Sequence, residues 1–391
     1  MLLKVILLCN IVICASALQK LDFPPGFKFG AATAAYQVEG AWNISDKTPS
    51  VWDNFVHTKP YKIKDYSNAD VACDSYRNWK RDIEMAEELG LHYYRFSISW
   101  TRLMPTGFPN YISEDGREYY SNFIDALLAK NIEPFVTIYH WDLPQSLQDL
   151  GGWANPLVID WFADYARVVF SLYADRVKTW LTVNEPSAFC SFSYNSGEHA
   201  PGILGLYTYP VYSKSGGWPP AVEKYMRDQA VKEKRTKSRL PELSKEEIDF
   251  IRGTYDFYGV NFYTSREVRR LRRGEPGVKW PMEGSTDYNF TFGINPNWEQ
   301  SSEWFYIYPE AIRLLLNYIK NMYGDIEIVI TENGFGGSET FLEDYNRIDY
   351  YEKHLEQLLL AIHEDGINIK IRTLPSRFQG PQPSATSSSL G

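Results

Sequence analysis

The sequence predicts an α/β protein in which a parallel sheet is wrapped by helices. Short apolar runs alternate along most of the chain with amphipathic stretches, an order typical of parallel sheets. The 391 residues, 44% of them hydrophobic, can bury a large core in one barrel-sized domain or in two smaller ones. Polar residues follow several of the apolar runs, at the strand ends where barrels of this class carry their chemistry.

Seven short apolar runs are candidate strands, and five amphipathic stretches are candidate helices. The strands are Phe29–Ala35, His92–Ser97, Glu133–Tyr139, Thr179–Asn184, Tyr258–Phe262, Glu327–Thr331 and Ile367–Ile371. The helices are 72–89, 116–129, 157–175, 308–322 and 346–363. In the first helix, apolar residues recur every three or four positions and form a face that can pack on a sheet.

The beginning of the chain is typical of a secretory signal. Lys4 precedes an apolar run, Val5–Cys14, that is too short to span a bilayer, and Ala15-Ser16-Ala17 is a cleavage-like site. We therefore expect residues 1–17 to be removed and the mature protein to be secreted, or lysosomal, without a membrane segment. Two cysteines remain after cleavage, Cys73 and Cys190, which either form one disulfide or stay as buried thiols.

Composition and motifs give no support to several classes of partner. The net charge of −9 gives no support to nucleic-acid binding. The sequence has no Cys/His cluster with metal-ligand spacing and no glycine-rich phosphate loop, so we expect no metal and no cofactor.

Two segments have a composition unlike that of a packed core. Residues 228–248 mix Lys, Arg and Glu, as solvated helices and excursions from a fold do. Residues 375–391, rich in Pro, Ser, Gln and Gly, read as a disordered tail.

Two glutamates follow strand-like runs at corresponding places. Glu185 lies in Thr182–Pro186, and Glu332 lies in Ile330–Gly334. A carboxylate at the end of a buried strand is costly unless its charge is paired or used. Taken singly, the first string could open a helix and the second could form an Asn-Gly turn. Taken together, they suggest the carboxyl pair that glycoside hydrolysis needs.

Six strings in this order resemble glycoside hydrolase family 1, the family of β-glucosidases, lactase-type enzymes and insect myrosinase-like enzymes. They are Phe27–Gly40 (FKFGAATAAYQVEG), Tyr94–Trp100 (YRFSISW), Tyr139–Pro144 (YHWDLP), Thr182–Pro186 (TVNEP), Asp256–Thr264 (DFYGVNFYT) and Ile330–Gly334 (ITENG). The resemblance covers roughly residues 22 to 370 and implies a (β/α)8 TIM barrel acting on a small-molecule glycoside.

The resemblance implies a role for each matching residue. Glu185 corresponds to the acid/base and Glu332 to the nucleophile of a retaining mechanism. The residues that correspond to sugar-hydroxyl ligands are Gln37, His140 and Asn184. Those that correspond to supports of the nucleophile carboxylate are Arg95 and Tyr263.

Two parts of the family pattern are missing from this chain. After Ala200–Ile203 the family typically has several dozen more residues, which include the fourth outer helix and the fifth strand. After Lys370 the family has a strand and a Trp-rich loop, whereas this chain has Ile371–Pro375 and the tail. We therefore expect residues 18–374 to form an incomplete barrel, with the fifth strand deleted and the eighth strand and its loop replaced. A truncated splice product or an imperfect gene model would give this pattern.

The sequence leaves three functional hypotheses. The first is an exported retaining β-glycosidase acting on β-glucosides or related O-glycosides. The second is a catalytically weak or inactive sugar-binding isoform, and the third is a non-enzymatic or unfolded isoform. Because plant thioglucoside-cleaving members have Gln where this chain has Glu185, O-glycosides are favoured, but the likeness to insect myrosinase-like enzymes leaves thioglucosides open.

Overall fold

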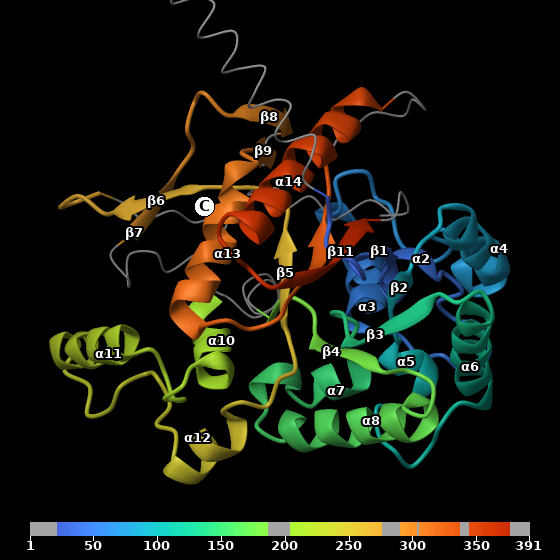
Figure 1. Cartoon of the computed structure of the whole chain (residues 1–391). Coiled ribbons are helices and arrows are strands. Elements are labelled where there is room, and N and C mark those ends of the chain that lie inside the picture. The colour runs from blue at the N-terminus through green and yellow to red at the C-terminus, as the bar shows by residue number, and fades with distance from the viewer. Residues whose placement is uncertain (1–21, 187–203, 276–289, 303–304, 337–343, 376–391) are drawn as a thin grey trace, which may run out of the picture. The chain divides into compact units, whose positions relative to one another are not determined.

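The structure, a computed structural model, describes residues 22–186, 204–275, 290–302, 305–336 and 344–375, whose elements are labelled in Figure 1. The chain divides into two compact units. The N-terminal unit holds residues 28–186 together with the chain from residue 372 onward. The C-terminal unit holds residues 187–371 together with the chain up to residue 27. The expected signal (1–17), the tail beyond Pro375 and Cys190 lie outside the described residues.

The N-terminal unit contains four strands and the helices between them. Its strands are β1 (Lys28–Ala32), β2 (Tyr93–Ser97), β3 (Glu133–Tyr139) and β4 (Thr179–Val183). Its helices are α2 (Ala35–Val38), α3 (Val51–Thr58), η1 (Pro60–Lys62), α4 (Ser75–Glu88), α5 (Trp100–Leu103), α6 (Glu114–Ala129), α7 (Gln145–Asp149), η2 (Gly152–Ala154) and α8 (Val158–Tyr173).

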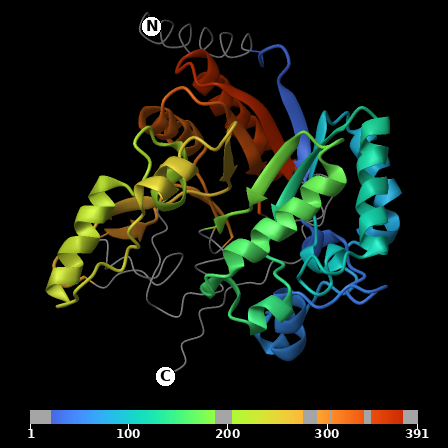
Figure 2. The same ribbon diagram turned by 90° about the horizontal axis from the view of Figure 1, so that it is seen from below.

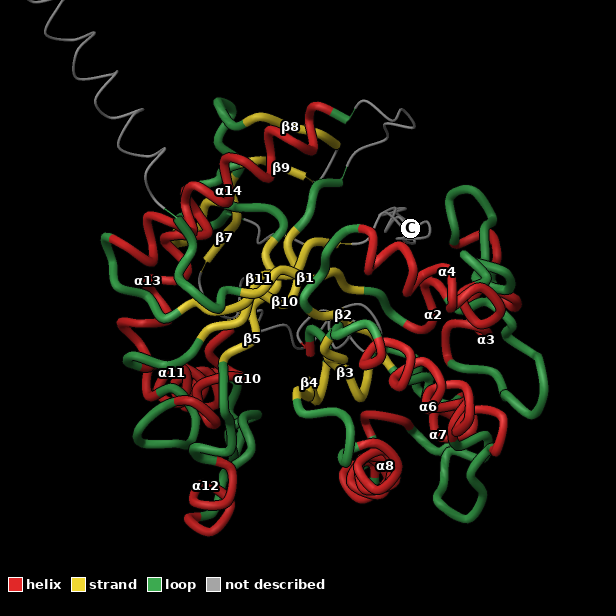
Figure 3. Tube along the Cα trace, turned by 45° about the vertical axis from the view of Figure 1, so that its right-hand side comes forward, coloured by secondary structure: helices red, strands yellow, loops and turns green. Residues whose placement is uncertain are grey.

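The four strands form a parallel sheet in the order β4-β3-β2-β1. Helices α4, α6 and α8 lie outside these strands, and α4 and α6 run side by side (Figures 2 and 3). The Tyr76 and Tyr119 rings join these two helices, with centroids 4.9 Å apart. The predicted parallel sheet with helices on its outside is therefore confirmed for this unit.

The core of this unit is built largely from aromatic rings. Trp100 and Tyr165 stack with centroids 4.2 Å apart, and Tyr93 stacks on Phe135 at 4.2 Å. All four side chains are almost completely buried. Tyr93 also explains why residue 30 is glycine, because a Cβ on Gly30 would lie 2.4 Å from the Tyr93 carbonyl oxygen.

The first strand is shorter than predicted. It ends at Ala32, and α2 begins at Ala35, whereas the apolar run suggested a strand through Ala35. The chain turns because the Ala35 amide donates to the Ser97 hydroxyl (2.7 Å) and the Val38 amide donates to the Ala34 carbonyl. Alanine fits either conformation, so the apolar run alone did not mark this boundary.

The C-terminal unit contains the remaining elements. Its strands are β5 (Tyr258–Phe262), β6 (Glu267–Arg270), β7 (Phe290–Gly293), β8 (Glu299–Ser302), β9 (Phe305–Ile307), β10 (Ile328–Asn333) and the first residues of β11 (Ile369–Pro375). Its helices are α10 (Leu204–Tyr212), α11 (Pro220–Lys232), α12 (Lys245–Ile251), α13 (Glu310–Tyr323) and α14 (Tyr345–His363).

Strands β5 and β10 are parallel neighbours, and β6–β7 and β8–β9 are antiparallel hairpins that the sequence did not predict. Helix α13 is fixed to the end of α14, because Arg313 donates to Glu364 (2.8 Å) and to Asp365 (2.6 and 2.7 Å). The predicted solvated region 228–248 contains the end of α11 and the start of α12, both largely exposed.

The structure bears on both expected gaps. The described residues 204–257 form α10, α11 and α12 and contain no strand, as expected if the fifth strand is deleted. The last predicted strand, however, extends to Pro375 as β11, so residues 371–375 are a strand where we expected an eighth strand to be replaced. Thr373 is buried, and its hydroxyl lies 2.6 Å from the Tyr93 hydroxyl, which anchors this end of the strand.

Candidate active site

Five of the predicted site residues lie in the N-terminal unit, at or near the carboxyl ends of its strands. Arg95 lies within β2, and His140 directly follows β3. Asn184 and Glu185 directly follow β4, and Gln37 lies on α2, shortly after β1. Because the strands are parallel, these ends share one edge of the sheet.

Arg95, Asn184 and His140 form a hydrogen-bonded chain. The Arg95 guanidinium, 1% exposed, donates through Nε to the Thr137 hydroxyl (3.0 Å) and through Nη2 to Asn184 Oδ1 (2.8 Å). With its oxygen engaged, the Asn184 amide turns its nitrogen toward His140 Nε2, at 3.1 Å. His140 Nε2 is therefore the acceptor, which assigns the proton of a neutral imidazole to Nδ1.

The backbone around Glu185 is held in an uncommon conformation. Glu185 has φ 43°, in the left-handed region that non-glycine residues rarely adopt. The Trp141 indole N–H donates to the Asn184 carbonyl (2.9 Å), so the peptide that leads into Glu185 is fixed. Trp141 itself has φ 74°. Backbone strain of this kind is characteristic of functional sites.

The C-terminal unit carries Tyr263 and Glu332, the other two predicted site residues. Glu332 lies in β10, where the pairing with β5 shifts register between Ile330 and Glu332. Its side chain is 9% exposed, and the Tyr263 hydroxyl donates to Oε2 at 2.6 Å. A short O–H···O contact of this kind is typical of a hydrogen bond to an ionised carboxylate.

Asn333 and Tyr350 hold this pair in position, and the sequence reasoning missed both. Asn333 is fully buried, and its Nδ2 donates to the Phe262 carbonyl (2.8 Å) and to the Tyr350 hydroxyl (2.9 Å). The Tyr350 hydroxyl donates in turn to the carbonyl of Tyr263 (3.0 Å). Asn333 closes β10 rather than opening a turn, so the Asn-Gly turn interpretation was wrong. Neighbouring residues of a strand point to opposite faces of the sheet, so the sequence could have indicated that Asn333 and Glu332 face opposite ways.

The predicted residues thus fall into two groups, one in each unit. Arg95, His140, Asn184 and Glu185 belong to the N-terminal unit, with Gln37 on α2, and Tyr263 and Glu332 belong to the C-terminal unit. Within its own unit, Arg95 contacts Thr137 and Asn184. Among the residues that the structure describes, no group of three or more His, Cys, Asp and Glu side chains could hold a metal ion.

Sequence comparison identifies a family. The sequence model of glycosyl hydrolase family 1 matches residues 19–212 and 203–378. Myrosinase 1 of Brevicoryne brassicae is 36% identical over 416 aligned positions, which cover 89% of this chain and 88% of that protein. The cytosolic beta-glucosidase of Homo sapiens is 34% identical, covering 90% of this chain and 88% of that protein.

Solved structures agree with the sequence comparison. Aphid myrosinase superposes with a TM-score of 0.82 at 35% identity, covering 90% of this chain and 89% of that chain. The β-glucosidase of Thermotoga maritima in complex with deoxynojirimycin has a TM-score of 0.76 at 32% identity, covering 90% of this chain and 89% of that chain. The predicted fold class, an α/β barrel of the TIM type, is confirmed by these superpositions.

The relatives contain residues that have no counterpart here. The alignment with the Brevicoryne brassicae protein spans 416 positions, more than the 391 residues of the whole chain. The two family segments also meet at residues 203–212, where the sequence pattern suggested a deletion. These matches extend over nine-tenths of the chain at more than 30% identity, and on that ground the chain belongs to glycosyl hydrolase family 1.

Proposed function

We propose that the chain is a retaining β-glycosidase that hydrolyses β-glucosides or related O-glycosides by double displacement. The observation that carries the proposal is the short hydrogen bond from the Tyr263 hydroxyl to the buried carboxyl of Glu332. That bond stabilises the charged carboxylate, which is the form a nucleophile needs. The family membership supports the same reaction type.

Two steps follow from these assignments. In the first, Glu332 attacks the anomeric carbon while the bond to the leaving oxygen breaks, and Glu185 donates its proton to that oxygen. In the second, water attacks the glycosyl-enzyme ester, Glu185 takes a proton from the water, and Glu332 leaves as a carboxylate. This mechanism requires about 5–5.5 Å between the two carboxyl groups.

The hydrogen-bonded chain of the N-terminal unit suits sugar recognition. His140 carries its proton on Nδ1, and Asn184 is oriented by Arg95, so both present fixed polar groups at the strand ends. Gln37 adds an amide from α2. Fixed donors and acceptors discriminate strongly in favour of a substrate with matching hydroxyls, because an unmatched partner leaves them unpaired.

Replacement of the nucleophile tests the proposal. We expect Glu332→Gln to lower kcat for an aryl β-glucoside by at least about 10⁴-fold, because the uncharged amide cannot form the ester. Deoxynojirimycin, the ligand of the Thermotoga maritima structure, should still bind this variant in calorimetry. Turnover unchanged by Glu332→Gln would exclude the assignment.

A second candidate function has an observation in its favour. The chain lacks residues that its relatives have, and its described residues 204–257 contain no strand. This favours a sugar-binding isoform with weak or no turnover. Deoxynojirimycin binding by the unaltered chain without release of the aryl group would select this alternative.

The substrate class is the finer part of the proposal. Glu185 provides a general acid, which an alkoxide leaving group requires and a thiolate leaving group does not. We therefore favour O-glycosides, with thioglucosides as the alternative suggested by the likeness to proteins named myrosinase. The ratio of kcat/KM for an aryl O-glucoside and its S-linked counterpart decides between them.

We also propose that the protein is exported and glycosylated. In the described part of the chain no helix is both long and apolar enough to cross a bilayer. Asn43 of the sequon Asn43-Ile44-Ser45 is exposed and therefore accessible to a glycan; the second sequon begins at Asn289, outside the described residues. Secretion by cultured cells, with the mass of one glycan lost in Asn43→Gln, is the expected result.

A further inference from the structure

Asp142 is a buried acid that has no role in the proposed mechanism. It lies two residues after His140 and is 2% exposed. No group in the described part of the chain reaches either carboxyl oxygen with full hydrogen-bond geometry; the Asp142 amide and the Ser99 hydroxyl lie only close enough to lower its pKa. A buried carboxyl without a well-formed hydrogen bond is strongly unfavourable, so a polar ligand is the expected solution.

The Asp142 side chain lines a small cavity in the N-terminal unit. The cavity has a volume of about 10 Å³ and is lined also by Tyr36, Glu39, Lys47 and Ser99. The Tyr36 hydroxyl is buried and has no hydrogen-bond partner among the described residues. A polar cavity of this size has room for about one water molecule.

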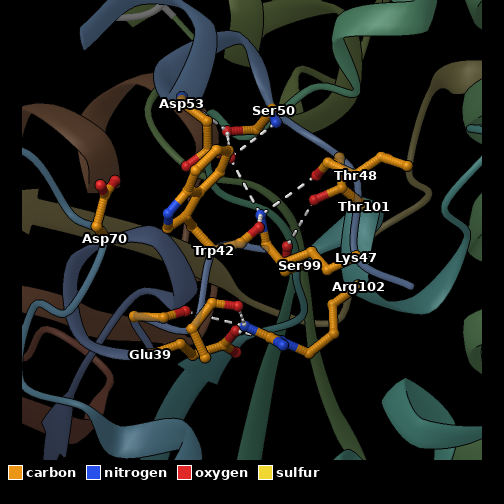
Figure 4. A network of polar contacts seen from close by, with 12 residues as sticks. Glu39, Trp42, Lys47, Thr48, Ser50, Asp53, Asp70, Ser99, Thr101 and Arg102 are labelled. Carbon is orange, nitrogen blue, oxygen red and sulfur yellow. Dashed lines mark hydrogen bonds and ion pairs between the residues drawn. The ribbon is translucent and has the colours of Figure 1, made fainter. Parts of the chain in front are cut away.

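The other charged groups around the cavity already have partners, as Figure 4 shows. The Lys47 ammonium donates to the Trp42 carbonyl (3.2 Å), the Thr48 carbonyl (3.3 Å) and Asp53 Oδ2 (3.1 Å), which uses its three protons. Asp53 also accepts from the amide and hydroxyl of Ser50, each at 2.8 Å. No proton of Lys47 is left for Asp142.

Glu39 is also satisfied. Its Oε2 accepts from Arg102 Nε (2.9 Å), and its Oε1 accepts from the Tyr120 hydroxyl (2.7 Å). The cavity wall carries the carboxylates of Glu39 and Asp53 as well as the Lys47 ammonium, so charge alone does not select between a cation and a water molecule. A water molecule, however, can both accept from a hydroxyl and donate to a carboxyl.

We propose that this cavity binds one water molecule that accepts from the Tyr36 hydroxyl and donates to Asp142, and that Asp142 is thereby a positioning residue for sugar binding. Tyr36 precedes Gln37 on α2, and Asp142 follows His140 beyond β3. The water links the two segments that carry these predicted sugar ligands. The positioning role of Asp142 rests on the proposed function, whereas the water site does not.

High-resolution crystallography tests the water site directly. We expect one density peak within about 2.6–3.2 Å of both the Asp142 carboxyl and the Tyr36 hydroxyl. An empty cavity would overturn the proposal. Anomalous signal at this position in crystals soaked with thallium(I) would also overturn it, because a monovalent cation would then be the ligand.

Variants test the positioning role. Asp142→Leu removes the polar group at similar volume, Asp142→Asn keeps it, and Tyr36→Phe removes only the hydroxyl. We expect Asp142→Leu and Tyr36→Phe each to weaken deoxynojirimycin binding and raise KM by about tenfold, with kcat nearly unchanged. In Asp142→Asn, the deoxynojirimycin affinity and KM should stay close to those of the unaltered chain. The exposed Asp160→Asn serves as a control.

The outcomes separate the two proposals. Unchanged deoxynojirimycin affinity in both Tyr36→Phe and Asp142→Leu would overturn the positioning role. Equal losses in Asp142→Asn and Asp142→Leu would also overturn it, because the polar group would then not be what matters. A chain that binds deoxynojirimycin but does not release the aryl group would overturn the proposed function alone. If Asp142→Leu does not fold, Tyr36→Phe decides.

Discussion

The contact between Tyr263 and Glu332 joins two residues that are 69 positions apart in sequence. Because Tyr350 in turn holds the Tyr263 backbone, the hydroxyl reaches the carboxyl without reorganisation. A preorganised donor of this kind stabilises the carboxylate more than a mobile water does.

Removal of the Tyr263 hydroxyl is expected to weaken catalysis without destroying it. A hydrogen bond to a charged group contributes about 1.5–3 kcal/mol, so Tyr263→Phe should lower kcat/KM by roughly 10- to 100-fold. Loss of the donor favours the protonated carboxyl, and the acidic limb of the pH–rate profile should move to higher pH.

The half-exposed Tyr318 of α13 offers a matched control. Tyr318→Phe removes an identical hydroxyl, and we expect unaltered kinetics. If Tyr263→Phe also leaves kcat/KM and the pH profile unaltered, the hydrogen bond seen at 2.6 Å has no part in catalysis.

The sequence predicted the positions of single site residues correctly where these residues lie in a family motif. Glu185, Glu332, Arg95, His140 and Asn184 all lie in or directly after strands, as predicted. The partners Thr137, Asn333 and Tyr350 were missed, because hydrogen bonds between residues distant in sequence have no local signature.

Among the elements, the C-terminal end of β10 is anchored by one buried side-chain amide, that of Asn333. Asn333 links β10 to β5 through the Phe262 carbonyl and to α14 through Tyr350. Asn333→Ala removes both hydrogen bonds and leaves a buried carbonyl unsatisfied. We expect the free energy of unfolding to fall by about 2–3 kcal/mol in urea titration. The exposed Asn321→Ala of α13 should change it by less than about 0.5 kcal/mol; equal effects would contradict the anchoring role.

The segment after β3 should give the protein a pH-dependent stability. Burial, and then the charge of Glu39, raises the pKa of Asp142 to about 7, from an ordinary value of 3.8. The Asp142 backbone amide, Lys47 and the Ser99 hydroxyl oppose this shift, and Asp53 and Tyr36 are the other titratable groups among the described residues that line the cavity.

The sign of the effect follows from linkage. Because the folded state holds the Asp142 proton more tightly than the unfolded state, stability falls as the pH rises from about 4 to about 7. Asp142→Asn should remove this contribution, so the variant gains stability relative to the unaltered chain between pH 5 and pH 8. Thermal unfolding of both proteins at several pH values measures this stability difference. A difference that does not change with pH would contradict the raised pKa of Asp142.

Elements were predicted well where periodicity was strong and less well where it was not. The long helices α4, α6, α8, α13 and α14 have clear apolar faces and were found within a few residues. The hairpins β6–β7 and β8–β9 were missed, because their four- and three-residue strands are too short to show alternation. The last strand was predicted as Ile367–Ile371 from its apolar run, whereas β11 runs from Ile369 to Pro375.

For the molecule as a whole, fold class and family were accessible from the sequence. Six strings in order indicated the barrel family, and TM-scores of 0.82 and 0.76 confirm the fold. The sequence left open one large domain or two smaller ones, because the division into two compact units depends on contacts between residues far apart in the chain. The gaps expected after residues 203 and 370 could be predicted only by comparison with the family pattern.

Covalent trapping tests the central claim most directly. A 2-deoxy-2-fluoro aryl β-glucoside with an activated leaving group forms the glycosyl-enzyme ester but slows its hydrolysis. We expect mass spectrometry of the digested protein to find one added glycosyl group, on the peptide that carries Glu332, and none in Glu332→Gln. An adduct on any other residue, or release of the aryl group without an adduct, would contradict Glu332 as the nucleophile.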